Sequence, residues 1–487
     1  METPFGSIPD DRVGRLSMAE IHEELSKRTI SRRTILKGGL LAGGAIAAGP
    51  VLWRRPGFAA VPPAGRHLAF GTDPRHEMSV SWSTAEPVEH PVVDIGLGGA
   101  FDLTVAADTW GVRGTDTTYH QARVSGLEPA TTYTYRVRHD GGESPSATFH
   151  TAPAASETFT FTSFGDQGVN DDAAAITALV EKIAPAFQFH VGDICYAYRV
   201  GFGNPLEPAP PVQALVPILT DQSVWDAWLA MVSPQAARAP WMTTVGNHEM
   251  EYGYGPLGYD SYSARFALPQ NGPAGAPTIY SFRYGNAAFI ALDGNDSSHE
   301  IRPNRNYTAG AQEGWLRATL IGLRSDPAID FIVAGFHNCS YCTNIVHGSD
   351  AGPRERWGAL FDEFTVDLVV NGHNHQYERT HPIRGGSATV EAPPGATINP
   401  ETAGTTYITA GGGGQLGYQA STFPLSAVTI DLGLRIPEVA DWSATRYLDL
   451  SLIAVDVAPR DATGVATMTI KALTVDGSEI ERITLRR

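Results

Sequence analysis

Cysteine is scarce in this chain, because only Cys195, Cys339 and Cys342 occur among 487 residues. So few thiols exclude a disulfide scaffold, which requires several pairs. The Cys-x-x-Cys pair at 339 and 342 supplies too few ligands for a structural zinc ion. The sequence is compatible with one small disulfide between these two positions and equally with thiols packed in the core.

Positive charge is also in short supply, because 35 lysine and arginine residues face 52 acidic residues and give a net charge of −17. Such a balance argues against the broad basic surface that binds nucleic acid. Hydrophobic residues make up 42% of the chain and charged residues 18%, as in a folded protein rather than a disordered one. The length is sufficient for two or three domains.

Long apolar runs are missing, since the charge-free stretch at 38–53 has 16 residues and a membrane span needs about 20. The preceding residues 31–37, Ser-Arg-Arg-Thr-Ile-Leu-Lys, resemble the twin-arginine export signal. Small residues at 57–60 suit a cleavage site. We predict a cleaved leader at residues 1–60 and a periplasmic, cell-wall-associated or secreted protein without a membrane span. An uncleaved anchor helix is the alternative.

Residues 65–153 show the short alternating segments of an all-β domain. Tyr133, Tyr135 and Val137 share one face of a predicted strand. The pattern Leu-x-Pro-x-Thr-x-Tyr-x-Tyr-x-Val around them resembles the corner of a fibronectin type III sandwich, with Trp82 as its buried tryptophan. This range has no cluster of metal-ligating residues, which favours a supporting or docking module over a binding site.

Residues 158–487 form a second predicted domain, in which apolar strands alternate with amphipathic segments. The predicted strands are 159–164, 187–191, 241–245, 287–292, 331–334 and 368–370. The predicted helices are 173–183, 223–231, 312–323 and 356–364. The stretches 447–457, 466–473 and 479–485 are predicted to close the second sheet of this domain. Two Pro- and Gly-rich stretches, 201–217 and 252–276, are predicted loops near a site entrance.

Five of these strands are followed by residues that can bind metal ions. In chain order these residues are Asp166, Asp193, Tyr196, Asn247, His337, His373 and His375. In an open α/β sheet, sites form at the carboxyl ends of strands, so the side chains can converge. An aspartate after a glycine is usually a turn residue, but five such strand ends in order favour a metal site. Seven oxygen and nitrogen ligands suffice for two metal ions if one aspartate bridges them.

The five blocks read Asp-Gln-Gly, Gly-Asp-Ile-Cys-Tyr, Gly-Asn-His-Glu, Ala-Gly-Phe-His and Gly-His-Asn-His. In this order they resemble the signature of the purple acid phosphatases, within the calcineurin-like metallophosphoesterase superfamily. Residues 376–379 continue the resemblance, whereas Ala334 departs from it by replacing a valine. The resemblance implies an α/β metallophosphoesterase sandwich of two mixed sheets flanked by helices, preceded by an all-β fibronectin type III-like sandwich.

The resemblance also implies a role for each residue. A ferric ion would be held by Asp166, Asp193, Tyr196 and His375, with Asp193 bridging to a divalent iron, zinc or manganese ion held by Asn247, His337 and His373. His248 would contact substrate or protonate the leaving group, and His347 would be a second catalytic histidine. Hydroxide held by the metals would attack phosphorus in line. Glu249 would either orient His248 or be an exposed turn carboxylate.

These implications favour an exported acid phosphatase-type hydrolase whose partner is a phosphate monoester. One alternative is a phosphodiesterase that acts on nucleotides or phospholipid head groups with the same metals. An alternative of another class is a non-catalytic cell-surface binding protein that uses the sandwich domain, and the complete set of ligand residues counts against it.

Overall fold

The computed structural model describes residues 2–3, 6–7, 61–198, 219–415 and 425–487. The chain divides into two units, Met1–Phe58 and Ala59–Arg487. In the first unit, β1 (Glu2–Thr3) and β2 (Gly6–Ser7) pair antiparallel. The rest of the predicted leader and the predicted loop 201–217 lie outside the described residues. Across the described ranges, no helix is both long and apolar enough to cross a membrane.

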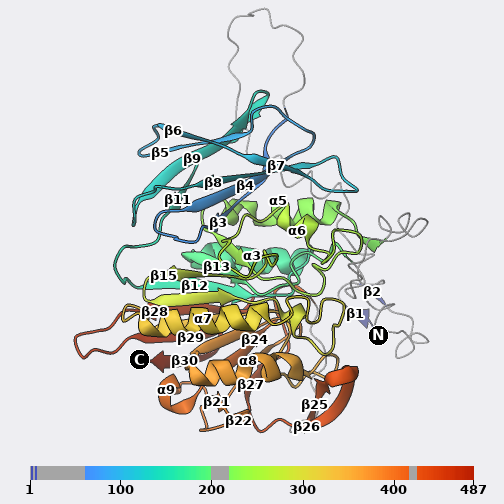
Figure 1. The fold of residues 1–487 in the computed structure, drawn as a ribbon, viewed down its shortest axis with the longest axis vertical. Helices are drawn as coiled ribbons and strands as arrows, with labels where there is room; N and C mark the ends of the chain where they lie inside the picture. The colour runs from blue at the N-terminus through green and yellow to red at the C-terminus, as the bar shows by residue number, and fades with distance from the viewer. Residues whose placement is uncertain (1, 4–5, 8–60, 199–218, 416–424) are drawn as a thin grey trace, which may run out of the picture. The chain divides into compact units, whose positions relative to one another are not determined.

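The second unit begins with two antiparallel sheets that pack face to face (Figure 1). One sheet has the order β3 (Ala64–Phe70), β4 (Met78–Thr84), β8 (Thr118–Val124) and β7 (Asp108–Gly111). The other has the order β10 (Gly142–Glu143), β9 (Thr132–His139), β5 (Val92–Gly96) and β6 (Leu103–Ala106), with β11 (Ala147–His150) also paired to β9. Trp82 is buried, and the Tyr133 hydroxyl accepts the Glu128 N–H at 2.9 Å. These are features of the predicted sandwich.

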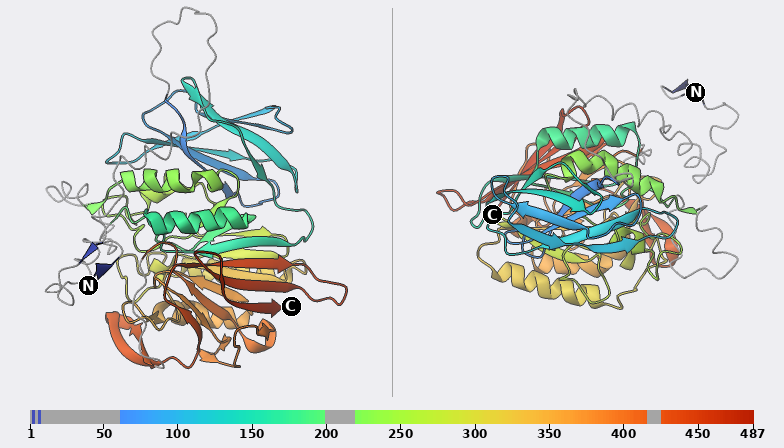
Figure 2. Two further views of the ribbon diagram at one scale, coloured as in Figure 1. Left: turned by 180° about the vertical axis from the view of Figure 1, so that it is seen from behind. Right: turned by 90° about the horizontal axis from the view of Figure 1, so that it is seen from above.

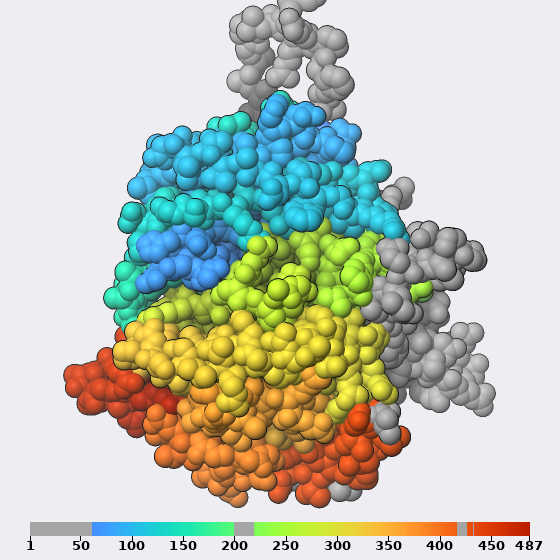
Figure 3. All heavy atoms as spheres, viewed as in Figure 1, coloured from blue at the N-terminus to red at the C-terminus, as the bar shows by residue number. Residues whose placement is uncertain are grey.

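The sandwich packs directly against the residues that follow it. Strand β3 lies against helix α5 (Ser223–Ala236), and every residue of β4 is buried. Figure 3 shows the blue and cyan atoms of the sandwich in contact with the green atoms of the later segments. The predicted boundary at residues 153–158 stays a prediction, because residues 59–487 form one compact unit.

Two seven-stranded mixed sheets form the core of the rest of the described unit. The first sheet has the order β14 (Trp241–Thr243), β13 (Phe187–His190), β12 (Phe159–Phe164), β28 (Ser451–Ala458), β29 (Thr467–Thr474), β30 (Glu479–Arg486) and β23 (Thr397–Ile398). The second sheet has the order β15 (Tyr280–Tyr284), β16 (Ala287–Ala291), β17 (Phe331–Gly335), β19 (Leu368–Asn371), β24 (Thr406–Ala410), β20 (Tyr377–Thr380) and β27 (Ser443–Tyr447). Strands β12, β13 and β14 run parallel, as do β16, β17, β19 and β24.

Aromatic side chains fill the space between the two sheets. The Phe289 ring of the second sheet lies 5.0 Å from the rings of both Phe161 and Phe187 of the first sheet. Helices α7 (Ala311–Ser325) and α8 (Ala351–Glu363) cover the opposite face of the second sheet, where Leu316 and Trp357 join its core. Helix α3 (Asp171–Ile183) packs on the first sheet at β28 and also contacts helix α5. The predicted sandwich of two mixed sheets flanked by helices is therefore confirmed.

Smaller elements lie outside the two large sheets and include a three-stranded sheet and a two-stranded sheet. They are α6 (Asp260–Ser263), η2 (Gly294–Asp296), β18 (Ser349–Asp350), β21 (Ile383–Arg384), β22 (Ser387–Ala388), α9 (Pro400–Ala403), β25 (Leu425–Ile430), η3 (Asp431–Gly433) and β26 (Leu434–Val439).

The structure differs from the sequence prediction in several places, of which three involve the packing of the layers. The predicted strand 447–457 is interrupted, because β27 pairs with β20 in the second sheet whereas β28 pairs with β12 in the first. The C-terminal strands β28–β30 extend the first sheet, next to β12 (Figure 2), so the prediction that they close the second sheet is wrong. Helix α8 begins before the predicted 356, because the Asp350 side chain accepts the Gly352 N–H at 2.9 Å as an N-cap. The predicted rim loop 252–276 is largely buried, and Ser263 O accepts from Gln121 of the sandwich.

Candidate metal centre

The predicted ligand residues lie where the carboxyl ends of strands from both sheets meet. Asp166, Asp193 and Asn247 follow β12, β13 and β14 of the first sheet, whereas His337 and His373 follow β17 and β19 of the second. The Gly165 N–H donates to Ala410 O at 2.8 Å. This bond joins the end of β12 in the first sheet to the end of β24 in the second. The site therefore lies between two sheets. The sequence had suggested instead a site along the edge of one open sheet.

The backbone at this junction has unusual conformations that bring the ligands together. Four of the predicted ligands have a positive φ: Asp166 (59°), Asp193 (50°), Tyr196 (59°) and His373 (68°). A left-handed conformation costs a non-glycine residue about 1 kcal/mol or more, so it persists where the surrounding contacts impose it. A Cβ atom on Gly372 would lie 2.7 Å from Asp166 Oδ2, so this close approach requires glycine.

One group of ligand atoms comes from Asp193, His337 and His373. His337 Nε2 lies 3.1 Å from Asp193 Oδ2 and 3.3 Å from His373 Nδ1, and all three side chains are buried. Metal–ligand bonds of about 2.0–2.1 Å in tetrahedral geometry separate neighbouring ligand atoms by about 3.3 Å. The spacing and the donor types of these residues therefore fit a divalent ion.

The electrostatics of this group show concentrated negative charge. Burial lowers the pKa of His337, but the facing carboxylates of Asp193 and Asp166 outweigh burial and raise this pKa to about 10. Burial likewise acts to raise the pKa of Asp193, yet the imidazoles of His337 and His248 hold it well below its ordinary value. A metal ion can provide the positive charge that the protonated imidazole provides here.

A second group comes from Asp166, Tyr196 and His375. The Tyr196 hydroxyl donates to Asp166 Oδ1 at 3.3 Å and lies 3.2 Å from His375 Nε2. His375 Nε2 and Asp166 Oδ1 are 3.5 Å apart. His337 Nε2 also lies 3.9 Å from Asp166 Oδ1, so the two groups are adjacent. Carboxylate and phenolate oxygens are hard ligands, which suit a trivalent cation better than a soft one.

The loop after β14 brings Asn247 and His248 to the same place. Asn247 is 5% exposed, and the His248 N–H donates to Asp193 Oδ1 at 2.9 Å. His248 Nδ1 lies 2.7 Å from Tyr198 O, so Nδ1–H is the donor and Nε2 carries the lone pair. His248 Nε2 lies 3.9 Å from Asp193 Oδ2. Burial is the main cause that lowers the pKa of His248.

Glu249 does neither of the things that the sequence suggested for it. Its carboxylate is 1% exposed and accepts three backbone N–H groups, from Asp193 at 2.9 Å, Ile194 at 2.8 Å and Gly246 at 2.7 Å. Burial, and then the charge of Asp193, raises the pKa of Glu249 to about 8. Glu249 therefore joins the loop after β13 to the loop after β14.

His347 contacts Glu300, a residue of the site that the sequence did not predict. His347 Nδ1 lies 2.7 Å from Glu300 Oε1, and the centroids of the His347 and His373 rings are 4.0 Å apart. Glu300 follows η2 in the segment after β16, at the same edge of the second sheet. Strand β16 ends at Ala291, and other polar residues come between it and Glu300, so spacing from the strand end does not single out Glu300.

The three cysteines, all within the described residues, are buried thiols. Cys339 Sγ–H donates to Gly372 O at 2.7 Å, next to the ligands His337 and His373. Cys339 therefore supports the turn of the last ligand loop, and the structure contains no 339–342 disulfide.

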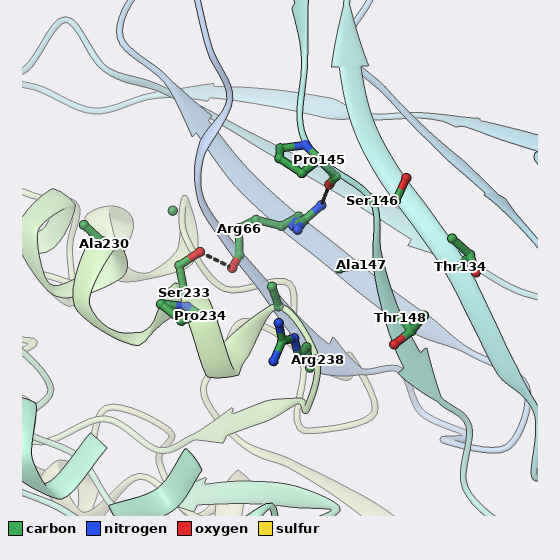
Figure 4. Close-up of a pocket in the computed structure, with 12 residues that line it drawn as sticks. Arg66, Thr134, Pro145, Ser146, Ala147, Thr148, Ala230, Ser233, Pro234 and Arg238 are labelled. Carbon is green, nitrogen blue, oxygen red and sulfur yellow. Dashed lines mark hydrogen bonds between the residues drawn. The ribbon is translucent and has the colours of Figure 1, made fainter. Parts of the chain in front are cut away.

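A separate cavity of about 830 Å³ lies between the sandwich and the C-terminal end of α5 (Figure 4). Arg66, Ser233 and Arg238 are among its lining residues. Residue 238 precedes β14, whereas Asn247 follows that strand, so this cavity and the ligand groups lie at opposite ends of β14.

Comparisons with known proteins identify the family of this chain. Residues 63–163 match the family described as purple acid phosphatase, N-terminal domain, and residues 159–377 match calcineurin-like phosphoesterase. An uncharacterized protein of Mycobacterium tuberculosis is 34% identical over 474 residues, which cover 87% of this chain and 86% of the relative. Purple acid phosphatase 23 of Arabidopsis thaliana is 29% identical over 313 residues, which cover 61% of this chain and 62% of the relative.

The fold has a solved counterpart. The structure of the purple acid phosphatase PPD1 from yellow lupin (Lupinus luteus) seeds superposes with a TM-score of 0.70 at 19% identity, and the match covers 88% of this chain and 75% of that one. The two family matches, the relatives and this fold together show that the chain belongs to the calcineurin-like phosphoesterases, as a purple acid phosphatase-like member.

Proposed function

We propose that this chain is an exported dimetal phosphohydrolase that cleaves phosphate monoesters. The observation that supports it most directly is the pair of adjacent ligand groups, Asp193–His337–His373 and Asp166–Tyr196–His375, at one junction of two sheets. A single metal site would need only one of these groups. Side chains that converge from five loops have no comparable role in a protein that only binds a partner through its sandwich.

The residues divide between two cations according to their chemistry. Asp166, Tyr196 and His375 would hold a ferric ion, because phenolate and carboxylate oxygens are hard ligands. His337, His373 and Asn247 would hold a divalent iron, zinc or manganese ion, and Asp193 would bridge. When bound, the two cations would acidify water and neutralise the charge of a phosphate group.

His248 and His347 are the proposed catalytic histidines. The hydrogen bond from His248 Nδ1–H to Tyr198 O fixes the ring and leaves Nε2 on the side of Asp193, where it can carry a proton to the leaving oxygen. His347 lies beside His373 and can donate a hydrogen bond to a phosphate oxygen from the divalent side. Both histidines hold the ester oxygens in place while the bond to phosphorus breaks.

The deciding experiment compares kcat/KM for nitrophenyl phosphate and bis(nitrophenyl) phosphate in the wild-type protein and in His373→Ala. We expect a preference for the monoester and a loss of at least about 10³-fold in the variant, because the divalent site loses a ligand. A preference for the bis ester would favour the phosphodiesterase. Unchanged phosphate release by His373→Ala would exclude the metal mechanism.

Export is a separate part of the proposal, and the pattern at residues 31–37 supports it. Replacing Arg32 and Arg33 together by lysine should retain the enzyme in the cytoplasm, because the signal requires the arginine pair. Cell fractionation followed by a phosphatase assay measures this, and equal export of both forms would contradict it. Replacing Arg54 and Arg55 by lysine, outside the motif, provides the control.

A further inference from the structure

Glu300 contacts two histidines of the site at once, one with each carboxylate oxygen. Its Oε1 lies 2.7 Å from His347 Nδ1, and its Oε2 lies 3.1 Å from His373 Nε2. The Glu300 side chain is 20% exposed, whereas that of His373 is 3% exposed. The carboxylate thus bridges a proposed metal ligand and a proposed catalytic histidine.

These contacts determine which nitrogen of each ring carries the proton. A carboxylate accepts hydrogen bonds, so His373 Nε2–H is the donor to Glu300 and His373 Nδ1 keeps its lone pair. His337 donates from Nδ1 to Val191 O at 2.9 Å, so its Nε2 is the nitrogen that faces Asp193 and that would bind the ion once the ion displaces its proton. These two nitrogens, His337 Nε2 and His373 Nδ1, lie 3.3 Å apart in one cluster with Asp193. In each ring, one nitrogen is fixed by a hydrogen bond, and the other nitrogen points toward the divalent site.

The segment that carries Glu300 is itself held in place. Asp350, which caps helix α8, accepts the Ser298 hydroxyl at 2.6 Å and the backbone N–H of His299 at 3.0 Å. The Glu300 N–H donates to the same carboxylate at 3.3 Å. A carboxylate on a backbone tied this way loses little additional entropy when it orients a ring, which is what pre-organises a ligand.

We propose that Glu300 is a positioning residue: it orients His373 so that Nδ1 faces the divalent ion, and it places His347 beside that ion. The inference rests on the proposed function, because it takes His373 as a metal ligand. It adds to that function a carboxylate from the segment after β16, which is outside the five ligand blocks. Carboxylate partners of metal-bound histidines typically contribute 10- to 100-fold to metal affinity.

The test measures zinc affinity, by chelator competition, in iron-loaded protein from which the divalent ion has been removed. We expect Glu300→Ala to weaken zinc binding about 10- to 100-fold. The zinc affinity of Glu300→Gln should lie between those of Glu300→Ala and the wild type, because the single amide oxygen can accept a hydrogen bond from only one of the two rings. His347→Ala should keep wild-type zinc affinity, since Glu300 still holds His373. The iron content should be unchanged throughout, because the contacts of Glu300 do not include Asp166, Tyr196 or His375.

Glu355→Gln is the control, because Glu355 of α8 also pairs with a histidine, His299 at 2.9 Å, which is not a proposed metal ligand. Zinc affinity within twofold of wild type in Glu300→Ala would overturn the inference. A third equivalent of zinc, lost in Glu300→Ala while the other two remain, would also overturn it by making Glu300 a ligand of its own site. If His373→Ala loses zinc but Glu300→Ala does not, only this inference fails. If His373→Ala keeps zinc and activity, the proposed function fails.

Discussion

The carboxylate of Glu249 accepts the backbone N–H of Asp193 at 2.9 Å, although the two residues are 56 positions apart. The same carboxylate accepts the N–H groups of Ile194 and Gly246. One buried side chain therefore determines the relative position of two loops, and these loops carry Asp193, Asn247 and His248.

The first prediction concerns this clamp. Glu249→Ala leaves three backbone N–H groups without their acceptor, and it should lower the free energy of unfolding by about 3 kcal/mol or more. Urea denaturation measures the change, and metal content should fall with it because the two ligand loops separate. The exposed Glu181→Ala is the control. A loss under about 1 kcal/mol would show that water replaces the carboxylate.

The second prediction concerns the Tyr196 phenolate. A tyrosinate bound to ferric iron absorbs visible light, so Tyr196→Phe should abolish the visible band of the native protein while the far-UV circular dichroism stays unchanged. Tyr198→Phe is the matched control, because it keeps the backbone carbonyl that accepts from His248. A band that persists in Tyr196→Phe, or metal analysis that finds two zinc ions and no iron, would contradict the assignment.

The third prediction separates acid catalysis by His248 from simple binding. His248→Ala should reduce kcat by about 10²–10⁴-fold on an alkyl phosphate, whose leaving group needs a proton. The loss on nitrophenyl phosphate should be much smaller, because nitrophenolate leaves without one. The exposed His90→Ala should behave as wild type on both substrates. Equal losses on the two esters would assign His248 to substrate binding alone.

The fourth prediction concerns the contact between the sandwich and the two-sheet core. The Tyr119 hydroxyl donates to Asp226 Oδ1 at 2.7 Å and accepts from the buried Arg265 Nη2 at 2.6 Å. Tyr119→Phe should therefore cost about 1–3 kcal/mol of stability and leave kcat/KM unchanged. Calorimetry should still show one transition. Two separate transitions in the wild type would show that the sandwich folds independently.

The fifth prediction is a pH dependence that originates in the sandwich. Burial, and less strongly the charge of His139, lowers the pKa of His120 from 6.5 to about 4. Between these values the unfolded chain binds a proton that the folded chain does not, so stability is lost as the pH falls from about 6.5 to about 4. His120→Gln should flatten this part of the curve of unfolding free energy against pH. An unchanged slope in His120→Gln would contradict the prediction.

The sequence predicted the local features of this protein well. The strand Phe159–Phe164 was predicted at its observed bounds, and the strands before Asp193 and His373 to within a residue or two. Tyr133, Tyr135 and Val137 showed the corner of the sandwich through the two-residue period of a strand. These features depend on residues close in the chain, so side-chain periodicity and motif spacing are sufficient to reveal them.

Three features of the site required the tertiary structure. The ligands come from two sheets, Glu249 clamps two loops, and Glu300 bridges two histidines from 47 and 73 positions away. Each depends on contacts between distant segments, which local periodicity does not encode. The sequence by itself determined which chemical groups are available and the loops on which they lie. The packing of one sheet on the other decided which of those groups meet, because only that packing brings the two sets of strand ends together.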